Sequence, residues 1–232
     1  MFLGGCAHLV PAPDTAPAAE PLVAWQRVLE RFVDDQGRVD YAGLAREPAD
    51  LRRFVSWIHA VGIERQPLAF HLDAYNALAM YNALARGVPA SLDGFERVRF
   101  FYLGRFELAG RSVSLYAYEN EVIRKFGDPR VHFALNCMAA GCPRLPRTPF
   151  LAGTLDEALE REALRFLNEA RNVQVDHAAR TVRLSAILDW YAEDFPPLLP
   201  YVNRYRADRI PEDYRVAFIP YDWTLNARGR SR

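Results

Sequence analysis

The residues best suited to chemistry lie in the stretch 119–143, where a thiol, an imidazole and a carboxylate occur together. Cys142 follows a glycine and precedes a proline, and such a corner brings the sulfur near backbone N–H groups that favour a thiolate. His132 is the candidate proton acceptor, and Glu119 is the candidate group that orients its ring. Asn136 can donate a hydrogen bond to an oxyanion. Together these groups predict acyl transfer or amide hydrolysis at a cysteine.

The two neighbouring cysteines also support other interpretations. In an oxidising compartment, Cys137 and Cys142 predict a disulfide that closes a short loop. Thiol–disulfide exchange is a third alternative, although the C-x₄-C spacing is longer than the usual C-x-x-C. A metal site is a fourth, but a second pair of ligands is missing. We therefore expect no metal and no other cofactor.

The histidine and the acid have structural interpretations as well. His132 lies between two apolar residues, a setting typical of a hydrogen-bonded core histidine. Glu119 can form a buried ion-pair network with Arg124 and Arg130, because buried acids are usually paired. Asp222 is the second choice for the acid that orients the imidazole. The sequence leaves these alternatives open.

The composition is that of a globular protein. The 232 residues are 50% hydrophobic and 25% charged, and 29 basic residues balance 29 acidic ones. Zero net charge argues against nucleic-acid binding, which favours a basic excess. No apolar run approaches the roughly 20 residues that cross a bilayer. We expect one domain over 21–227, followed by a short basic tail, 228–232.

The N-terminus predicts a lipid anchor. Residues 3–6 read L-G-G-C, which is typical of a bacterial lipobox, and a tether rich in Pro and Ala follows up to residue 20. We expect acylation of Cys6 to hold the chain on the periplasmic side of a bacterial membrane. The charged and apolar segments of a signal peptide do not precede this motif, so we expect the natural start further upstream. The alternative is an accidental L-G-G-C in a cytosolic protein.

Periodicity and turn residues predict an α+β fold, mainly helical, with a small and mostly antiparallel sheet. Helices are expected at 21–32, 48–61, 67–87, 116–126, 154–168, 185–191 and 202–206. Strands are expected at 106–108, 112–115, 130–136, 173–175, 182–184 and 215–219.

Several motifs resemble one family in the same order along the chain. The most specific is D-P-R-V-H-F-A-L-N-C-M-A-A-G-C-P at 128–143. It is accompanied by V-D-Y at 39–41, A-Y-N-A-L at 74–78, Glu119 with Arg124, W-Y-x-x-D-F at 190–195 and Y-D-W-x-L-N at 221–226. Together they resemble the family catalogued as domain of unknown function 547, over roughly residues 25–226.

The resemblance implies exported bacterial members and implies no settled activity. Three residues depart from the family pattern: His71 and Asp73 replace an aromatic ring and an amide, and Arg144 adds a charge beside the thiol. Two functions follow. One is an envelope binding or assembly module, with Cys137 and Cys142 as a structural element and an envelope protein or a small ligand as partner. The other is a thiol enzyme that uses Cys142.

Overall fold

Apolar residues that recur every three or four positions form the helices that carry the fold. In the computed structural model, which describes residues 7–229, α1 (Pro21–Phe32) packs on α3 (Ala49–Val61), and Trp25 stacks on Phe54 at 5.3 Å between ring centroids. The long helix α4 (Leu68–Ala85) is buried along most of its length. The remaining helices are α2 (Tyr41–Arg46), α5 (Phe95–Val98), α6 (Leu115–Glu121), α7 (Leu155–Asn168), α8 (Ile187–Trp190) and α9 (Leu198–Asn203).

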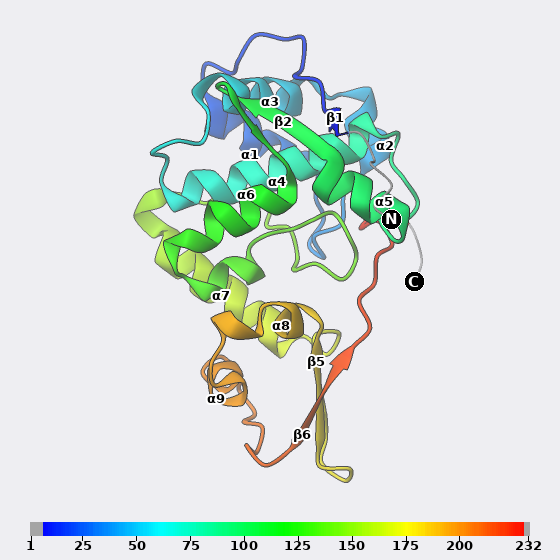
Figure 1. Cartoon of the computed structure of the whole chain (residues 1–232), viewed down its shortest axis with the longest axis vertical. Helices are drawn as coiled ribbons and strands as arrows, with labels where there is room; N and C mark the ends of the chain where they lie inside the picture. The colour runs from blue at the N-terminus through cyan, green and yellow to red at the C-terminus, as the bar shows by residue number, and fades with distance from the viewer. Residues whose placement is uncertain (1–6, 230–232) are drawn as a thin grey trace.

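The strands form two small sheets at opposite ends of the long axis in Figure 1. In the first, β2 (Gly104–Leu108) pairs with β1 (His8–Leu9) in parallel and with β3 (Arg111–Val113) antiparallel. In the second, β5 (Thr181–Ser185) pairs with β4 (Val173–Asp176) antiparallel and with β6 (Arg215–Ile219) in parallel. The α+β class is confirmed, and the expected single sheet is divided into two. A short turn joins the strands of each hairpin, so these strands are antiparallel. The chain between β5 and β6 includes α8 and α9, and this long connection allows the two strands to be parallel.

The stretch 130–136 was expected to be a strand, and that prediction is wrong. Pro129–Phe133 is a 3-10 helix whose first turn is capped by Asp128, since its carboxylate accepts a hydrogen bond from the backbone N of Arg130 at 2.9 Å. Its apolar side chains reach two different cores: Val131 joins the cluster around α4, and Phe133 joins the cluster around α7. A segment that contributes to two cores is as apolar as a buried strand, although it pairs with no strand. Its composition therefore predicted a strand wrongly.

Part of the predicted tether is packed against the domain. β1 lies in the first sheet, and Val10 is buried and donates its N–H to the carbonyl of Arg105 at 2.8 Å. Further along, the N–H of Ala18 bonds the carbonyl of Arg53 at 3.1 Å. The segment 7–20 is therefore not a free linker, because apolar residues and backbone hydrogen bonds hold it on the fold.

The segment after β6 runs back along the molecule and joins its two ends (Figure 1). Leu225 and Ala227 form isolated bridges with Ala139 and Val39, and the Tyr41 hydroxyl donates to Oδ1 of Asn226 at 2.9 Å. This return path places the Y-D-W motif beside the cysteine loop, although the two are far apart in sequence.

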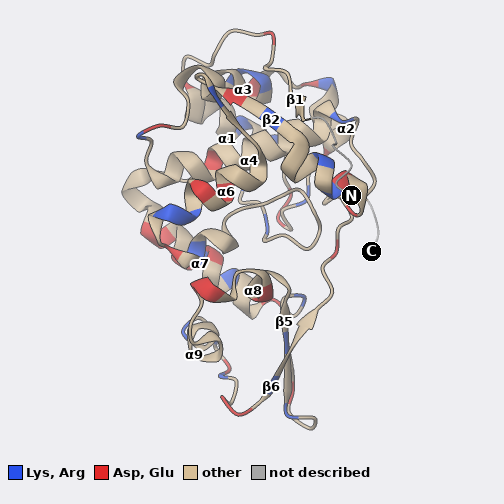
Figure 2. Cartoon of the chain, viewed as in Figure 1, with Lys and Arg blue, Asp and Glu red and all other residues tan. Residues whose placement is uncertain are grey.

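Charged residues of both signs are interspersed over the helices in the view of Figure 2, in keeping with the balanced composition. Within residues 7–229, no helix combines the length and the apolar character required to cross a bilayer.

The three residues that depart from the family pattern have structural partners. His71 lies in α4 and bonds the Tyr118 hydroxyl at 2.9 Å, and burial lowers its pKa to about 4. It is therefore neutral at pH 7 and does not act as a second titrating group there. Asp73 is buried beneath Trp25. The charge of Arg144 is paired with Glu169.

Candidate functional site

A cleft of about 870 Å³ opens between the helical part of the molecule and the returning C-terminal segment. It collects side chains from α4, α6, the cysteine loop, α8 and the segment after β6. Its walls are rich in aromatic side chains: Tyr75, Phe101, Tyr102, Tyr116, Trp190, Tyr191, Tyr221 and Trp223. A concave, mostly apolar site with a few converging polar groups is the usual form of a small-molecule site.

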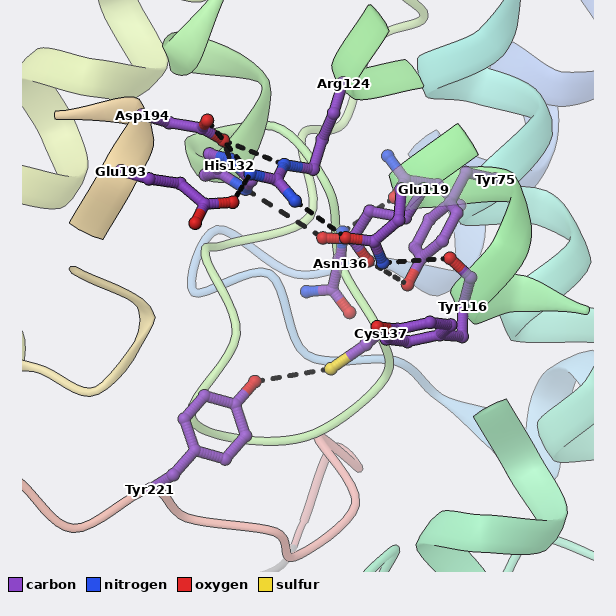
Figure 3. Close-up of polar contacts among 12 residues, drawn as sticks. Tyr75, Tyr116, Glu119, Arg124, His132, Asn136, Cys137, Glu193, Asp194 and Tyr221 are labelled. Carbon is purple, nitrogen blue, oxygen red and sulfur yellow. Dashed lines mark hydrogen bonds and ion pairs between the residues drawn. The ribbon is translucent and has the colours of Figure 1, made fainter. Parts of the chain in front are cut away.

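The cysteine pair forms part of this cleft. The sulfurs of Cys137 and Cys142 lie at disulfide distance, with Cα atoms 6.2 Å apart, so the predicted pairing is confirmed. Cys142 Sγ accepts hydrogen bonds from the Cys137 backbone N at 3.0 Å and from the Tyr221 hydroxyl at 3.1 Å. The same hydroxyl lies 3.3 Å from Cys137 Sγ, a contact drawn in Figure 3. Tyr221 therefore contacts both sulfurs.

Gly141 is needed for this arrangement. A Cβ atom at position 141 would lie 2.8 Å from the ring of Tyr221, closer than real side chains approach. The glycine that precedes Cys142 thus lets the tyrosine ring reach the sulfur. The close approach of Tyr221 explains why a glycine precedes Cys142, which the sequence alone did not explain.

His132 is buried in the cleft wall. Its ring stacks on Tyr191 at 4.0 Å between centroids, and its Nε2 lies 2.7 Å from Oδ2 of Asp194. Because a carboxylate only accepts, we assign the ring proton to Nε2 and a lone pair to Nδ1. Nδ1 has no hydrogen-bond partner among residues 7–229, and Glu119 Oε1 is 3.9 Å away. Burial lowers the pKa of His132, and nearby Glu119 and Asp194 only partly oppose it, so the imidazole is neutral at pH 7.

The predicted hydrogen-bonded series from Glu119 through His132 to Cys142 is not observed. Within the described part of the chain, no hydrogen bond joins His132 to Cys142, although both line the cleft. The acid bonded to His132 is Asp194, which sequence reasoning missed. Asp222 instead accepts a hydrogen bond from the backbone N of Thr224 at 3.0 Å. Asp194 belongs to the W-Y-x-x-D-F motif, so the sequence marked it as a residue of interest. No sequence pattern indicated that this motif lies beside His132, which is 62 positions away.

The predicted ion-pair network has different members. Arg124 binds Asp194 through Nε at 2.8 Å and Glu193 through Nη2 at 2.6 Å (Figure 3). Arg130 pairs with Asp128 at 2.7 Å and also with two acids of α7. Among residues 7–229, neither arginine pairs with Glu119. Both arginines follow α6. The Arg130–Asp128 pair is local, whereas the pairs with Glu193, Asp194, Asp156 and Glu160 join separate elements and depend on the tertiary fold.

Glu119 stands close to the cysteine loop and has neutral neighbours (Figure 3). Its Oε2 accepts a hydrogen bond from the Tyr75 hydroxyl at 3.1 Å, and its side chain is only 13% exposed. Its charge raises the pKa of Tyr75 and of Tyr221, adding to the larger effect of burial on each.

Asn136 serves the loop and not the cleft. Its Nδ2 donates to the Pro143 carbonyl at 2.6 Å, and its Oδ1 accepts from the Met138 N at 2.7 Å. Both ends of the amide are therefore engaged, and the expected oxyanion donor is a structural brace for the cysteine loop.

Cys6 lies outside the described residues. Within 7–229, no group of three or more His, Cys, Asp or Glu side chains is arranged to hold a metal ion.

The family model described as "Protein of unknown function, DUF547" matches residues 62–167. This match supports the DUF547 family for the part of the chain that holds α4, Glu119, His132 and the cysteine pair. Asp194, which bonds His132, and the cleft residue Tyr221 lie beyond the matched region. No curated protein and no solved structure matches the chain.

Proposed function

We propose that the protein is a small-ligand-binding module of the bacterial cell envelope, and that the aromatic cleft is its binding site. The observation that carries this proposal is the cleft itself. It has room for a small organic molecule and walls rich in aromatic side chains. It also holds two polar groups without a full set of partners, Nδ1 of His132 and the carboxylate of Glu119. In this proposal the disulfide holds one wall of the site.

A fragment screen tests the cleft. Trp190 is 46% exposed on its wall, so Trp190→Ala removes contact area without opening the core. We expect small fragments that bind the wild-type protein in ligand-observed NMR to lose about tenfold in affinity in Trp190→Ala, since one aromatic contact contributes roughly 1.4 kcal/mol.

Phe95→Ala is the matched control, because Phe95 is another exposed ring and does not line the cleft. Fragments that bind both variants as tightly as the wild type would place the binding site elsewhere and contradict the proposal.

The envelope location follows from the lipobox. β1 begins at His8, so acylation of Cys6 would hold the domain directly at the membrane surface without a long tether. We expect Cys6→Ser, expressed behind an export signal, to move the protein from the membrane to the released fraction. Immunoblots of the fractions measure this change, and undiminished membrane retention would argue against the anchor.

A second candidate function is thiol-dependent acyl transfer or amide hydrolysis by reduced Cys142. It is favoured by the two donors at this sulfur, the Cys137 N–H and the Tyr221 hydroxyl, because both would stabilise a thiolate after reduction. Alkylation rates after mild reduction test it. A fast reaction of Cys142 near pH 6 that slows in Tyr221→Phe supports it, whereas an unreactive thiol argues against it.

A further inference from the structure

We infer that the cleft selects ligands that carry an organic ammonium group, held between Glu119 and the aromatic walls. This inference rests on the proposed binding function and names the chemical class of the ligand.

The first argument is the charge of Glu119. Within residues 7–229, no Arg or Lys side chain forms an ion pair with it. Its polar neighbours are neutral: the Tyr75 hydroxyl at 3.1 Å, the Tyr191 hydroxyl and, at 3.9 Å, the imidazole of His132. A largely buried carboxylate without a cation is costly, and a cationic ligand would supply the missing partner.

Arg124, one of the two arginines that line the cleft within the described chain, is already engaged. Arg124 directs Nε and Nη2 to Asp194 and Glu193, and its Nη1 donates to Oδ1 of Asn120 at 2.9 Å. These contacts engage all three guanidinium nitrogens, and the two acids compensate the charge of Arg124. An ammonium group at Glu119 would therefore meet a carboxylate beside an arginine that is neutralised by other acids.

The second argument is the density of aromatic faces. Four of these rings form two stacked pairs in the cleft lining. The ring centroids of Tyr102 and Tyr116 are 4.6 Å apart, and those of Trp190 and Trp223 are 5.6 Å apart. Aromatic faces attract cations, and clusters of them recognise alkylated ammonium ions. Arg97 already lies over the Trp223 ring at 5.0 Å, so this wall accepts a cation within the protein itself.

Arg97 is also the competing charge. It lines the cleft and forms no ion pair within the described part of the chain, so it would favour an acid where Glu119 favours an amine. The test must therefore include an anion. Three probes of similar size serve this purpose: 2-phenylethylammonium, 2-phenylethanol and 3-phenylpropanoate.

Titration of each probe, followed by tryptophan fluorescence and calorimetry, measures the preference. We expect the ammonium probe to bind the wild-type protein about tenfold more tightly than the alcohol, and the propanoate to bind most weakly. Glu119→Gln keeps an acceptor for Tyr75 and removes the charge, so it should reduce the preference for the ammonium to less than about twofold. Glu121→Gln, an exposed acid of the same helix, should leave all three affinities unchanged.

Two results overturn the inference. If the three probes bind equally and all lose affinity in Trp190→Ala, the cleft binds ligands but does not select a cation, and the proposed function stands. If the ammonium probe binds equally well to the wild type and to Glu119→Gln, or does not bind at millimolar concentration, the carboxylate does not recognise it. The fragment screen then decides separately whether the cleft binds other molecules.

Discussion

Replacing Asp73 with asparagine is expected to stabilise the protein, by an amount that grows as the pH rises. The carboxyl group of Asp73 is buried at the start of α4. It accepts hydrogen bonds from Nε1 of Trp25 at 2.9 Å and from the backbone N of Phe150 at 3.0 Å. Burial raises its pKa from 3.8 to about 8, and these hydrogen bonds only partly oppose the shift.

The sign follows from proton binding. Between pH 3.8 and about 8 the folded chain keeps a proton on Asp73, whereas the unfolded chain has released it. The free energy of unfolding of the wild type therefore falls across this window, by at most about 1.4 kcal/mol per pH unit, and levels off above it. An asparagine has one acceptor, Oδ1, which can accept from Nε1 of Trp25 at 2.9 Å and from the backbone N of Phe150 at the 3.2 Å of the Oδ1 contact, in place of the 3.0 Å contact to Oδ2. It does not titrate, so its contribution does not change with pH.

Urea unfolding of both proteins at pH 5, 6, 7 and 8 measures the effect. Asp73→Ala is the companion variant, and it should be less stable than the wild type at low pH, since it leaves two buried donors without an acceptor. A difference between Asp73→Asn and the wild type that is constant with pH would show that the buried carboxyl is ionised in the folded chain. The stabilised variant also restores the amide that is usual in the family pattern at this position.

Removal of the disulfide is expected to lower the free energy of unfolding by about 2 kcal/mol, at the low end of the usual range because the closed loop is short. In Cys137→Ser the cross-link is lost and Cys142 becomes a free thiol buried in the cleft wall. For a chain of this size the melting temperature should fall by about 4–8 °C. Wild-type protein should lose the same amount when a reductant is added.

Calorimetry with and without reductant measures this loss. The double variant Cys137→Ser/Cys142→Ser is the control, since a reductant should not change its melting temperature. Thiol labelling of the folded, unreduced wild type gives the complementary result: Cys137 and Cys142 should not react. Rapid labelling of both would contradict the disulfide and return Cys142 to the role of nucleophile.

Local patterns predicted most of the elements. The apolar periodicity of 21–32 and 48–61 depends on residues three or four positions apart, and α1 and α3 begin and end within a residue of the prediction. The strand pairs around Gly110 and in 173–184 follow from alternation and turn residues. The pattern failed at 130–136, where Val131 and Phe133 are apolar because each enters a different core.

The sequence by itself determined most of the helices, both hairpins and the α+β class, and it offered the pairing of Cys137 and Cys142 as one alternative. It missed α2 and α5 and placed the last helix at 202–206, whereas α9 covers Leu198–Asn203. Only the tertiary structure decided that Asp194 binds His132, that Tyr221 contacts both sulfurs and that Glu119 faces aromatic rings without a cation. The reason is distance along the chain: periodicity and turn chemistry record interactions within a few residues. Contacts across 62 or 79 residues depend on how whole elements pack together.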